Sequence, residues 1–141
     1  MNIYFACSIT GGRNDEAVYQ MLVDALTADG HHVPTASLAQ SEVVALEQIV
    51  IPAEIYARDV AWIRESDALI AEVSTPSHGE GYEIGYALGL GKSVLCLHRA
   101  GVGVSKMITG NPDPNLTIRA YRTPQEGVTI LKGYLNGDFP G

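Results

Sequence analysis

The chain of 141 residues is poor in the features that mark secreted and membrane proteins. It has two cysteines, Cys7 and Cys96, which are too few for a disulfide framework and lie in apolar runs typical of buried strands. No apolar run approaches the roughly 20 residues that a membrane helix needs. The first residues lack the basic region and apolar stretch of a signal peptide. We therefore expect reduced, buried thiols in a cytoplasmic protein with no membrane partner.

Positive charge is also scarce, with 9 Lys+Arg against 16 Asp+Glu and a formal net charge of −7. This balance argues against a nucleic acid polymer as partner, although a local pocket of donors can still hold a small anion. No cysteine–histidine spacing indicates a metal, and nothing indicates an organic cofactor. The hydrophobic content of 46% is typical of a globular protein, and the length fits one domain over residues 1–141.

Short apolar runs alternate with longer stretches of helical periodicity. We predict strands near residues 2–7, 32–35, 67–73, 93–97 and 116–121, and helices over 15–29, 53–65, 80–90 and 124–135, with a short helix near Ser105 and a helix or loop over 39–51. Strands that are apolar throughout favour a parallel sheet covered on both faces. The pattern predicts an α/β fold: one doubly wound domain with a five-stranded, mostly parallel sheet. Ligands in such folds bind beyond the carboxyl ends of the strands.

The segment after the first predicted strand has the composition of a phosphate cradle. It consists of Ser8, Ile9, Thr10, Gly11, Gly12 and Arg13. Glycines let backbone amides turn towards a ligand, and the following helix presents its positive end. An ordinary strand-to-helix turn explains the same residues equally well.

Two carboxylates stand out as candidate reagents. Glu83 follows the loop after the third predicted strand, near a helix start that would favour its ionised form, and Glu80 competes for the same role. Asp59 shares a helix face with Ile55 and Ile63, where a carboxylate is costly unless it is paired or used. It is therefore a better candidate than Asp15, which we expect to be exposed. The alternatives are a solvated glutamate at a helix start and a buried ion pair of Asp59 with Arg58 or Arg64 of the same helix or with a distant arginine.

Two carboxylates that face one pocket are the minimum for cleaving a glycosidic bond. Beside a phosphate cradle, they suggest a substrate that joins a base, a sugar and a phosphate.

Four segments together resemble the nucleoside 2-deoxyribosyltransferase superfamily, and within it the 2′-deoxynucleoside 5′-phosphate N-hydrolases. They are residues 4–13 (YFACSITGGR), 59–62 (DVAW), 71–73 (AEV) and 76–85 (PSHGEGYEIG). The resemblance implies a flavodoxin-like or Rossmann-like domain that forms a homodimer. It departs from the family at Cys7, where glycine is usual, and at Thr10, where an arginine of the phosphate site is usual.

The resemblance also implies a role for individual residues. Glu83 would attack the anomeric carbon, Asp59 would handle the proton on the leaving base, and Tyr4 would assist them. The substrate would be held by Ser8, by Ser77 with Gly79, and by Ser105 reaching across from the partner subunit.

The implied reaction is hydrolysis of the N-glycosidic bond of a (2′-deoxy)nucleoside 5′-monophosphate through a covalent glycosyl-Glu83 intermediate. It releases free base and (deoxy)ribose 5-phosphate. Two alternatives stay open: base exchange on unphosphorylated deoxynucleosides, and a nucleotide-binding module without turnover. The preferred base and the choice between deoxyribose and ribose are also open.

Overall fold

The computed structural model describes residues 1–9, 15–36 and 50–137, and it shows four strands and five helices in this part of the chain. The strands are β1 (Ile3–Ala6), β2 (Ala68–Glu72), β3 (Ser93–Arg99) and β4 (Leu116–Tyr121). The helices are α1 (Glu16–Ala28), α3 (Pro52–Glu65), α4 (His78–Gly89), α5 (Lys106–Thr109) and α6 (Pro124–Leu135). Each lies at a position predicted from periodicity, while most of the segment 39–51 falls outside the described residues.

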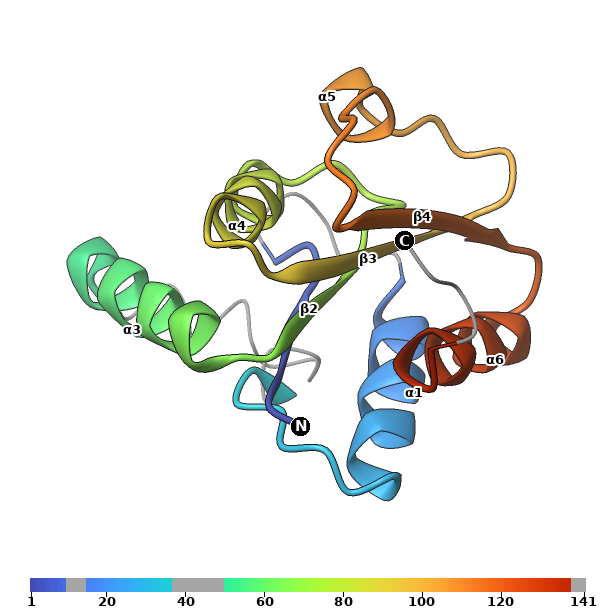
Figure 1. Ribbon diagram of the computed structural model, residues 1–141, viewed down its shortest axis with the longest axis horizontal. Helices are drawn as coiled ribbons and strands as arrows, with labels where there is room; N and C mark the ends of the chain where they lie inside the picture. The colour runs from blue at the N-terminus through green and yellow to red at the C-terminus, as the bar shows by residue number, and fades with distance from the viewer. Residues whose placement is uncertain (10–14, 37–49, 138–141) are drawn as a thin grey trace.

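The four strands form one sheet in the order β1-β2-β3-β4, and all three pairings are parallel. Helices cover both faces of this sheet (Figure 1). The α/β prediction with a parallel, doubly wound sheet is therefore confirmed. Because the strands are parallel, their carboxyl ends meet at one edge.

Alternate residues of each strand pack on opposite faces, which explains why the strands are apolar throughout. On one face, Ile3, Phe5 and Ile70 pack against α1 and α6. On the other face, Tyr4, Leu69 and Cys96 pack against α3 and α4. Both cysteines are buried and neither forms a disulfide, as predicted.

The predicted fifth strand over 32–35 is wrong, because this segment makes a single parallel bridge, between Asn2 and His32. His32 exchanges backbone hydrogen bonds with Met1 and Ile3. Pro34 has no N–H to continue the ladder, and the next inward donor, the N–H of Phe5, pairs with the Thr35 hydroxyl at 2.9 Å. The bridge still places this segment beyond β1, on the edge away from β2. Chain order therefore reverses between β1 and β2, which is where such folds open a ligand crevice.

Asp15 is buried, with 5% of its surface exposed, so the expectation of an exposed residue is wrong. It pairs with Arg99 Nε at 3.0 Å and accepts a hydrogen bond from Thr75. It occupies the N-cap position of α1 without making a side-chain cap. The ion pair with β3 offsets the cost of burying this carboxylate, and sequence spacing cannot reveal a partner 84 residues away.

A second buried carboxyl group, Glu72, closes the end of β2. It is fully buried, it accepts hydrogen bonds from the backbone N–H of Ser74 at 2.7 Å and from the Ser74 hydroxyl at 3.0 Å, and the Tyr121 hydroxyl donates to it. The Ser74 hydroxyl in turn accepts from the N–H of Arg99. Glu72 thereby ties the turn after β2 to β3 and β4.

In the described residues, no helix is long and apolar enough to cross a membrane.

We expect Glu72→Ala to lower the free energy of unfolding by about 2–4 kcal/mol, because it leaves buried donors of Ser74 and Tyr121 without a partner. Urea denaturation followed by circular dichroism measures this loss. Glu65→Ala, at the exposed end of α3, is the control and should stay within about 0.5 kcal/mol of the parent. A Glu72→Ala value as small as that of the control would show that this network does not stabilise the fold.

Candidate active site

A cavity of about 570 Å³ opens at the carboxyl end of β1, between that strand, α3 and the start of α4. Cys7 and Ile9 contribute the wall on the strand side. The other walls carry Asp59 from α3 and Glu83 from α4. The two candidate carboxylates, 24 residues apart in the chain, therefore face the same cavity.

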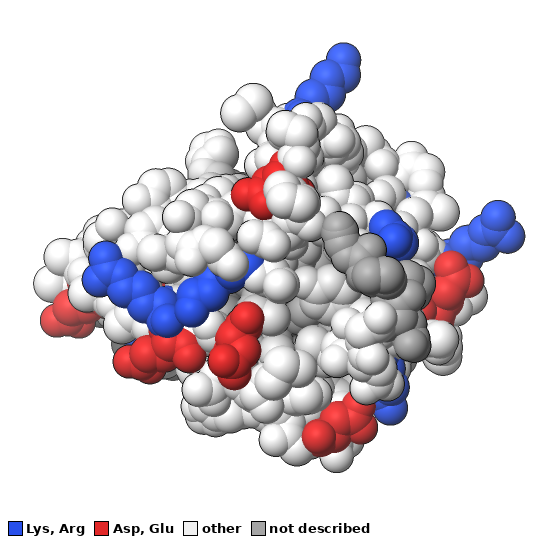
Figure 2. Space-filling view, in the orientation of Figure 1, with Lys and Arg blue, Asp and Glu red and all other residues white. Residues whose placement is uncertain are grey.

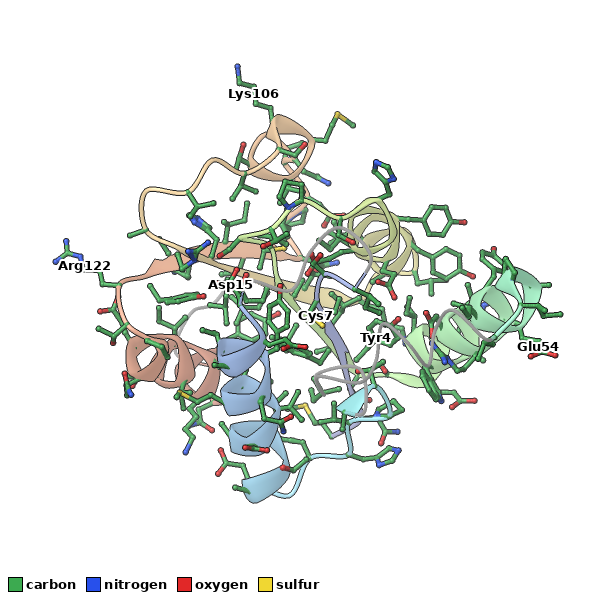
Figure 3. The ribbon with its side chains drawn as sticks, turned by 180° about the vertical axis from the view of Figure 1, so that it is seen from behind. Tyr4, Cys7, Asp15, Glu54, Lys106 and Arg122 are labelled. Atoms are coloured by element: carbon green, nitrogen blue, oxygen red, sulfur yellow. The ribbon has the colours of Figure 1, made fainter. Side chains whose placement is uncertain are left out.

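Glu83 lies in the second turn of α4, above Tyr4 of β1. Tyr4 is fully buried under the helix, and its hydroxyl donates a hydrogen bond to Glu83 Oε2. Figure 3 shows Tyr4 and Cys7 together in the interior of the molecule. This contact fixes one oxygen of the carboxyl group and leaves the other available to a substrate. The pairing of Tyr4 with Glu83 implied by the family resemblance is thus present in the structure.

The expectation that the start of α4 keeps Glu83 ionised is wrong. Burial raises its pKa from the ordinary value of 4.5 to about 8. The field of a helix end fades within its first turn, and Glu83 is the sixth residue of α4. Desolvation therefore outweighs the helix dipole, and most of the Glu83 population is protonated at neutral pH.

Asp59 both faces the cavity and forms an ion pair, the two possibilities considered for it from the sequence. Its side chain is 18% exposed, lines the cavity and pairs with Arg58 Nε at 2.8 Å. The guanidinium of Arg58 also lies over the Trp62 ring, 4.9 Å from its centroid. The ion pair is therefore anchored on the helix surface, and Asp59 remains accessible to a ligand in the cavity.

The start of α4 supplies the polar end of the cavity. Ser77 is the N-cap, and its hydroxyl accepts a hydrogen bond from the N–H of Glu80 at 3.3 Å. Ser77 and Gly79 both line the cavity. The N–H groups of a helix's first turn have no partners within the helix and attract anions. This end of the cavity can therefore receive a phosphate.

The remaining predicted binding residues are placed differently. Ile9 lines the cavity, whereas Ser8 is buried behind the wall and does not line it. Ser105 caps α5 by accepting from the N–H of Met107, is exposed, and lies outside the cavity of its own chain. Neighbouring Lys106 extends away from the molecule (Figure 3). Thr10, Gly11, Gly12 and Arg13 fall outside the described residues.

Two features of the cavity were not recognised from the sequence. Tyr56 and Tyr82 form an exposed aromatic rim, with ring centroids 6.3 Å apart in an edge-to-face arrangement. Their signal was the placement of one tyrosine three residues before Asp59 and another directly before Glu83. The second feature concerns charge: among the described residues, no lysine or arginine lines the cavity, although Asp59, Glu80 and Glu83 do. No group of three or more potential metal ligands occurs in the same part of the chain.

The chain with this parallel sheet and cavity matches the model of a known enzyme family. The chain belongs to the nucleoside 2-deoxyribosyltransferase family, whose model matches residues 3–114. The family resemblance drawn from the sequence is thus confirmed.

Named relatives narrow the comparison. A Methanosarcina mazei protein provisionally named 2′-deoxynucleoside 5′-phosphate N-hydrolase 1 is 44% identical over 120 residues, which cover 85% of this chain and 74% of the relative. The 5-hydroxymethyl-dUMP N-hydrolase of Mus musculus is 41% identical over 99% of this chain and 82% of the relative. The solved CMP N-glycosidase BcmB of Clostridium botulinum has the same fold, with a TM-score of 0.74, 22% identity, and coverage of 95% of this chain and 99% of that one.

We expect the Glu83 carboxyl carbon to titrate with a midpoint near pH 8, because burial disfavours its ionised form. Carbon-13 NMR of protein labelled at glutamate measures this midpoint, and Glu83→Gln assigns the signal. Tyr4→Phe should raise the midpoint further, since the lost hydrogen bond favoured the charged form. A midpoint near 4.5 in the parent would contradict the environment described for Glu83.

Proposed function

We propose that the protein hydrolyses the N-glycosidic bond of 2′-deoxynucleoside 5′-monophosphates, releasing the base and deoxyribose 5-phosphate. The observation that carries this proposal is that Asp59 and Glu83 line one cavity whose polar end is the start of α4. Glu83 can act on the sugar and Asp59 on the base, while the anion-binding end can hold the phosphate of a nucleotide. The names of the N-hydrolase relatives support the same reaction and the phosphorylated substrate.

In the first step, ionised Glu83 bonds to C1′ of the sugar, and the bond between C1′ and the base breaks with its electron pair passing to the base. Asp59 delivers a proton to the departing base. One proton shared by the two carboxyl groups is sufficient. Burial places that proton on Glu83 in the resting protein, and reaction requires it on Asp59.

In the second step, Asp59 accepts a proton from water while the water oxygen bonds to C1′. The ester bond between C1′ and Glu83 breaks, which regenerates the Glu83 carboxylate and leaves a proton on Asp59. Tyr4 holds Glu83 through both steps by its hydrogen bond to Oε2. Tyr56 and Tyr82 offer aromatic faces at the rim, where the base would leave.

Binding across subunits is part of the same proposal. Ser105 does not reach the cavity of its own chain. We infer that the protein is a homodimer in which Ser105 contacts the phosphate bound to the partner subunit, as the family resemblance implies. The segment of Thr10, Gly11, Gly12 and Arg13, which follows the cavity-lining Ile9, completes the proposed phosphate site, while Ser8 supports it from behind the wall. The proposed chemistry needs no metal or organic cofactor.

We expect Glu83→Gln to lower kcat roughly 10³-fold or more, and Asp59→Asn roughly 10²–10⁴-fold. Chromatography of mixtures containing dCMP, dGMP or deoxyadenosine, each with and without a second free base, measures both cleavage and exchange. Glu54→Gln, on the exposed start of α3 and pointing outward in Figure 3, is the control and should keep the parent rate. Base exchange without net hydrolysis would establish the transferase alternative. Binding of nucleotides without any turnover would establish the non-catalytic module.

We expect Ser77→Ala to raise KM for a deoxynucleoside monophosphate about tenfold, because it removes a hydroxyl from the phosphate end. Thr123→Ala is a matched control, since the Thr123 hydroxyl caps α6 by accepting from the N–H of Glu126 at 3.1 Å. Each variant should lose about 1 kcal/mol of unfolding free energy, measured in urea. Only Ser77→Ala should change KM. Equal KM values in both variants would leave Ser77 with a capping role alone.

A further inference from the structure

The side chain of Glu80 has an unusual direction for a glutamate near a helix start. It is the third residue of α4, with Ser77 as N-cap, which is the spacing of a capping box. Glu126 has the same position in α6 after Thr123, and its carboxylate turns back to accept from the N–H of Arg122 at 3.3 Å. Glu80 instead turns inward: only 3% of it is exposed, and its Oε2 has no hydrogen-bond partner among the described residues.

The surroundings of Glu80 disfavour a negative charge. Glu72 of β2 lies close enough to repel a negative charge on Glu80. A charge on Glu80 in turn raises the pKa of Tyr19 in α1 and of Cys96 in β3. Asp59 and Glu83 line the same cavity, as does Cys7 at the end of β1. None of these groups is positive, and among the described residues no lysine or arginine lines the cavity. Burial, and then repulsion by Glu72, raises the pKa of Glu80 well above its ordinary value.

We propose that Glu80 is a specificity-determining residue of this site: its buried carboxyl group admits a phosphate-bearing substrate while it is neutral and repels that substrate once it is ionised. This inference rests on the proposed function for the identity of the ligand. Glu80 follows Gly79 directly, at the end of the cavity where the start of α4 offers N–H groups to an anion. Glu80 belongs to the first turn of α4, whose N–H groups would hold that phosphate. No lysine or arginine lines the cavity among the described residues, so an added negative charge on Glu80 weakens anion binding there.

The direction of the pH effect follows from the position of the proton. At low pH Glu80 is neutral, and the described residues at this end of the cavity meet the phosphate with hydroxyl and N–H groups. As pH rises through its elevated pKa, Glu80 ionises and affinity for the phosphate falls. A ligand without a phosphate is much less sensitive, because it adds no charge beside Glu80.

Glu80→Gln tests this proposal, because it keeps the size of the side chain and cannot ionise. The probe is deoxyribose 5-phosphate, whose Kd is measured by isothermal titration calorimetry at pH 6 and pH 9. We expect the ratio of Kd at pH 9 to Kd at pH 6 to be roughly tenfold larger in the parent than in Glu80→Gln. Ionisation of the ligand phosphate and of Glu83 affects both proteins equally, so it cancels in this comparison. Glu126→Gln is the matched control and should keep the ratio of the parent.

Equal ratios in the parent and Glu80→Gln, with both proteins folded by circular dichroism, would overturn the role of Glu80. Absence of binding at both pH values would overturn it as well. The proposed function is judged separately, by cleavage of nucleotides. If nucleotides are cleaved but the Kd ratios of the parent and Glu80→Gln are equal, the Glu80 proposal is wrong and the proposed function stands. If the Kd ratios differ but no nucleotide is cleaved, the proposed hydrolase function is wrong and the role of Glu80 in phosphate binding stands. As a second readout, KM for dCMP should rise with pH more steeply than KM for deoxycytidine in the parent, and this difference should shrink in Glu80→Gln.

Discussion

The parallel pairing of β1 with β2 is the constraint on which the site depends. Its register, from Ile3 opposite Ala68 to Ala6 opposite Ala71, brings the ends of two strands 65 residues apart to the same edge. From that edge, α1 packs on one face of the sheet and α4 on the other. Two chain segments that leave neighbouring strands towards opposite faces open a crevice between them. Tyr4 lies beneath this crevice and donates to Glu83, so the strand register also sets the position of the proposed nucleophile.

Burial raises the pKa of three glutamates at this edge, but their hydrogen-bond partners differ. Glu72 is fully buried but receives donors from Ser74 and Tyr121, which suits a structural role. Glu83 keeps one donor, from Tyr4, and its pKa of about 8 leaves it able to gain or lose a proton near neutral pH. Glu80 has the least compensation, because the Oε2 oxygen has no partner in the described part of the chain. The three carboxyl groups are therefore distinguished by the number of hydrogen-bond donors that each receives.

The sequence predicted the elements well and indicated that Asp59 and Glu83 face one cavity, because the signals for both are local patterns. Apolar strands and a helix face shared by Ile55, Asp59 and Ile63 can be recognised over a few residues. Its errors concern contacts made at long range. Pro34 reduced a predicted strand to one bridge, because the N–H of Phe5 paired with a hydroxyl side chain instead of the ladder. Asp15 is buried and pairs with Arg99 of β3, and burial raises the pKa of Glu83 to about 8. Neither contact can be recognised from the residues next to it in the sequence.

Three of the few basic side chains of this acidic protein are bound to other groups of the chain. Arg58 is paired with Asp59, Arg99 with Asp15, and Lys92 donates to the carbonyls of Arg64 and Ser66. In Figure 2 a band of basic side chains at the left adjoins acidic side chains, and the other basic side chains drawn on this face are scattered. In the described residues, an anion in the cavity is therefore met by hydroxyl groups and helix N–H groups. Neutral donors offset a nearby carboxylate less than a cation does, so a neutral Glu80 would favour an anion at this end of the cavity.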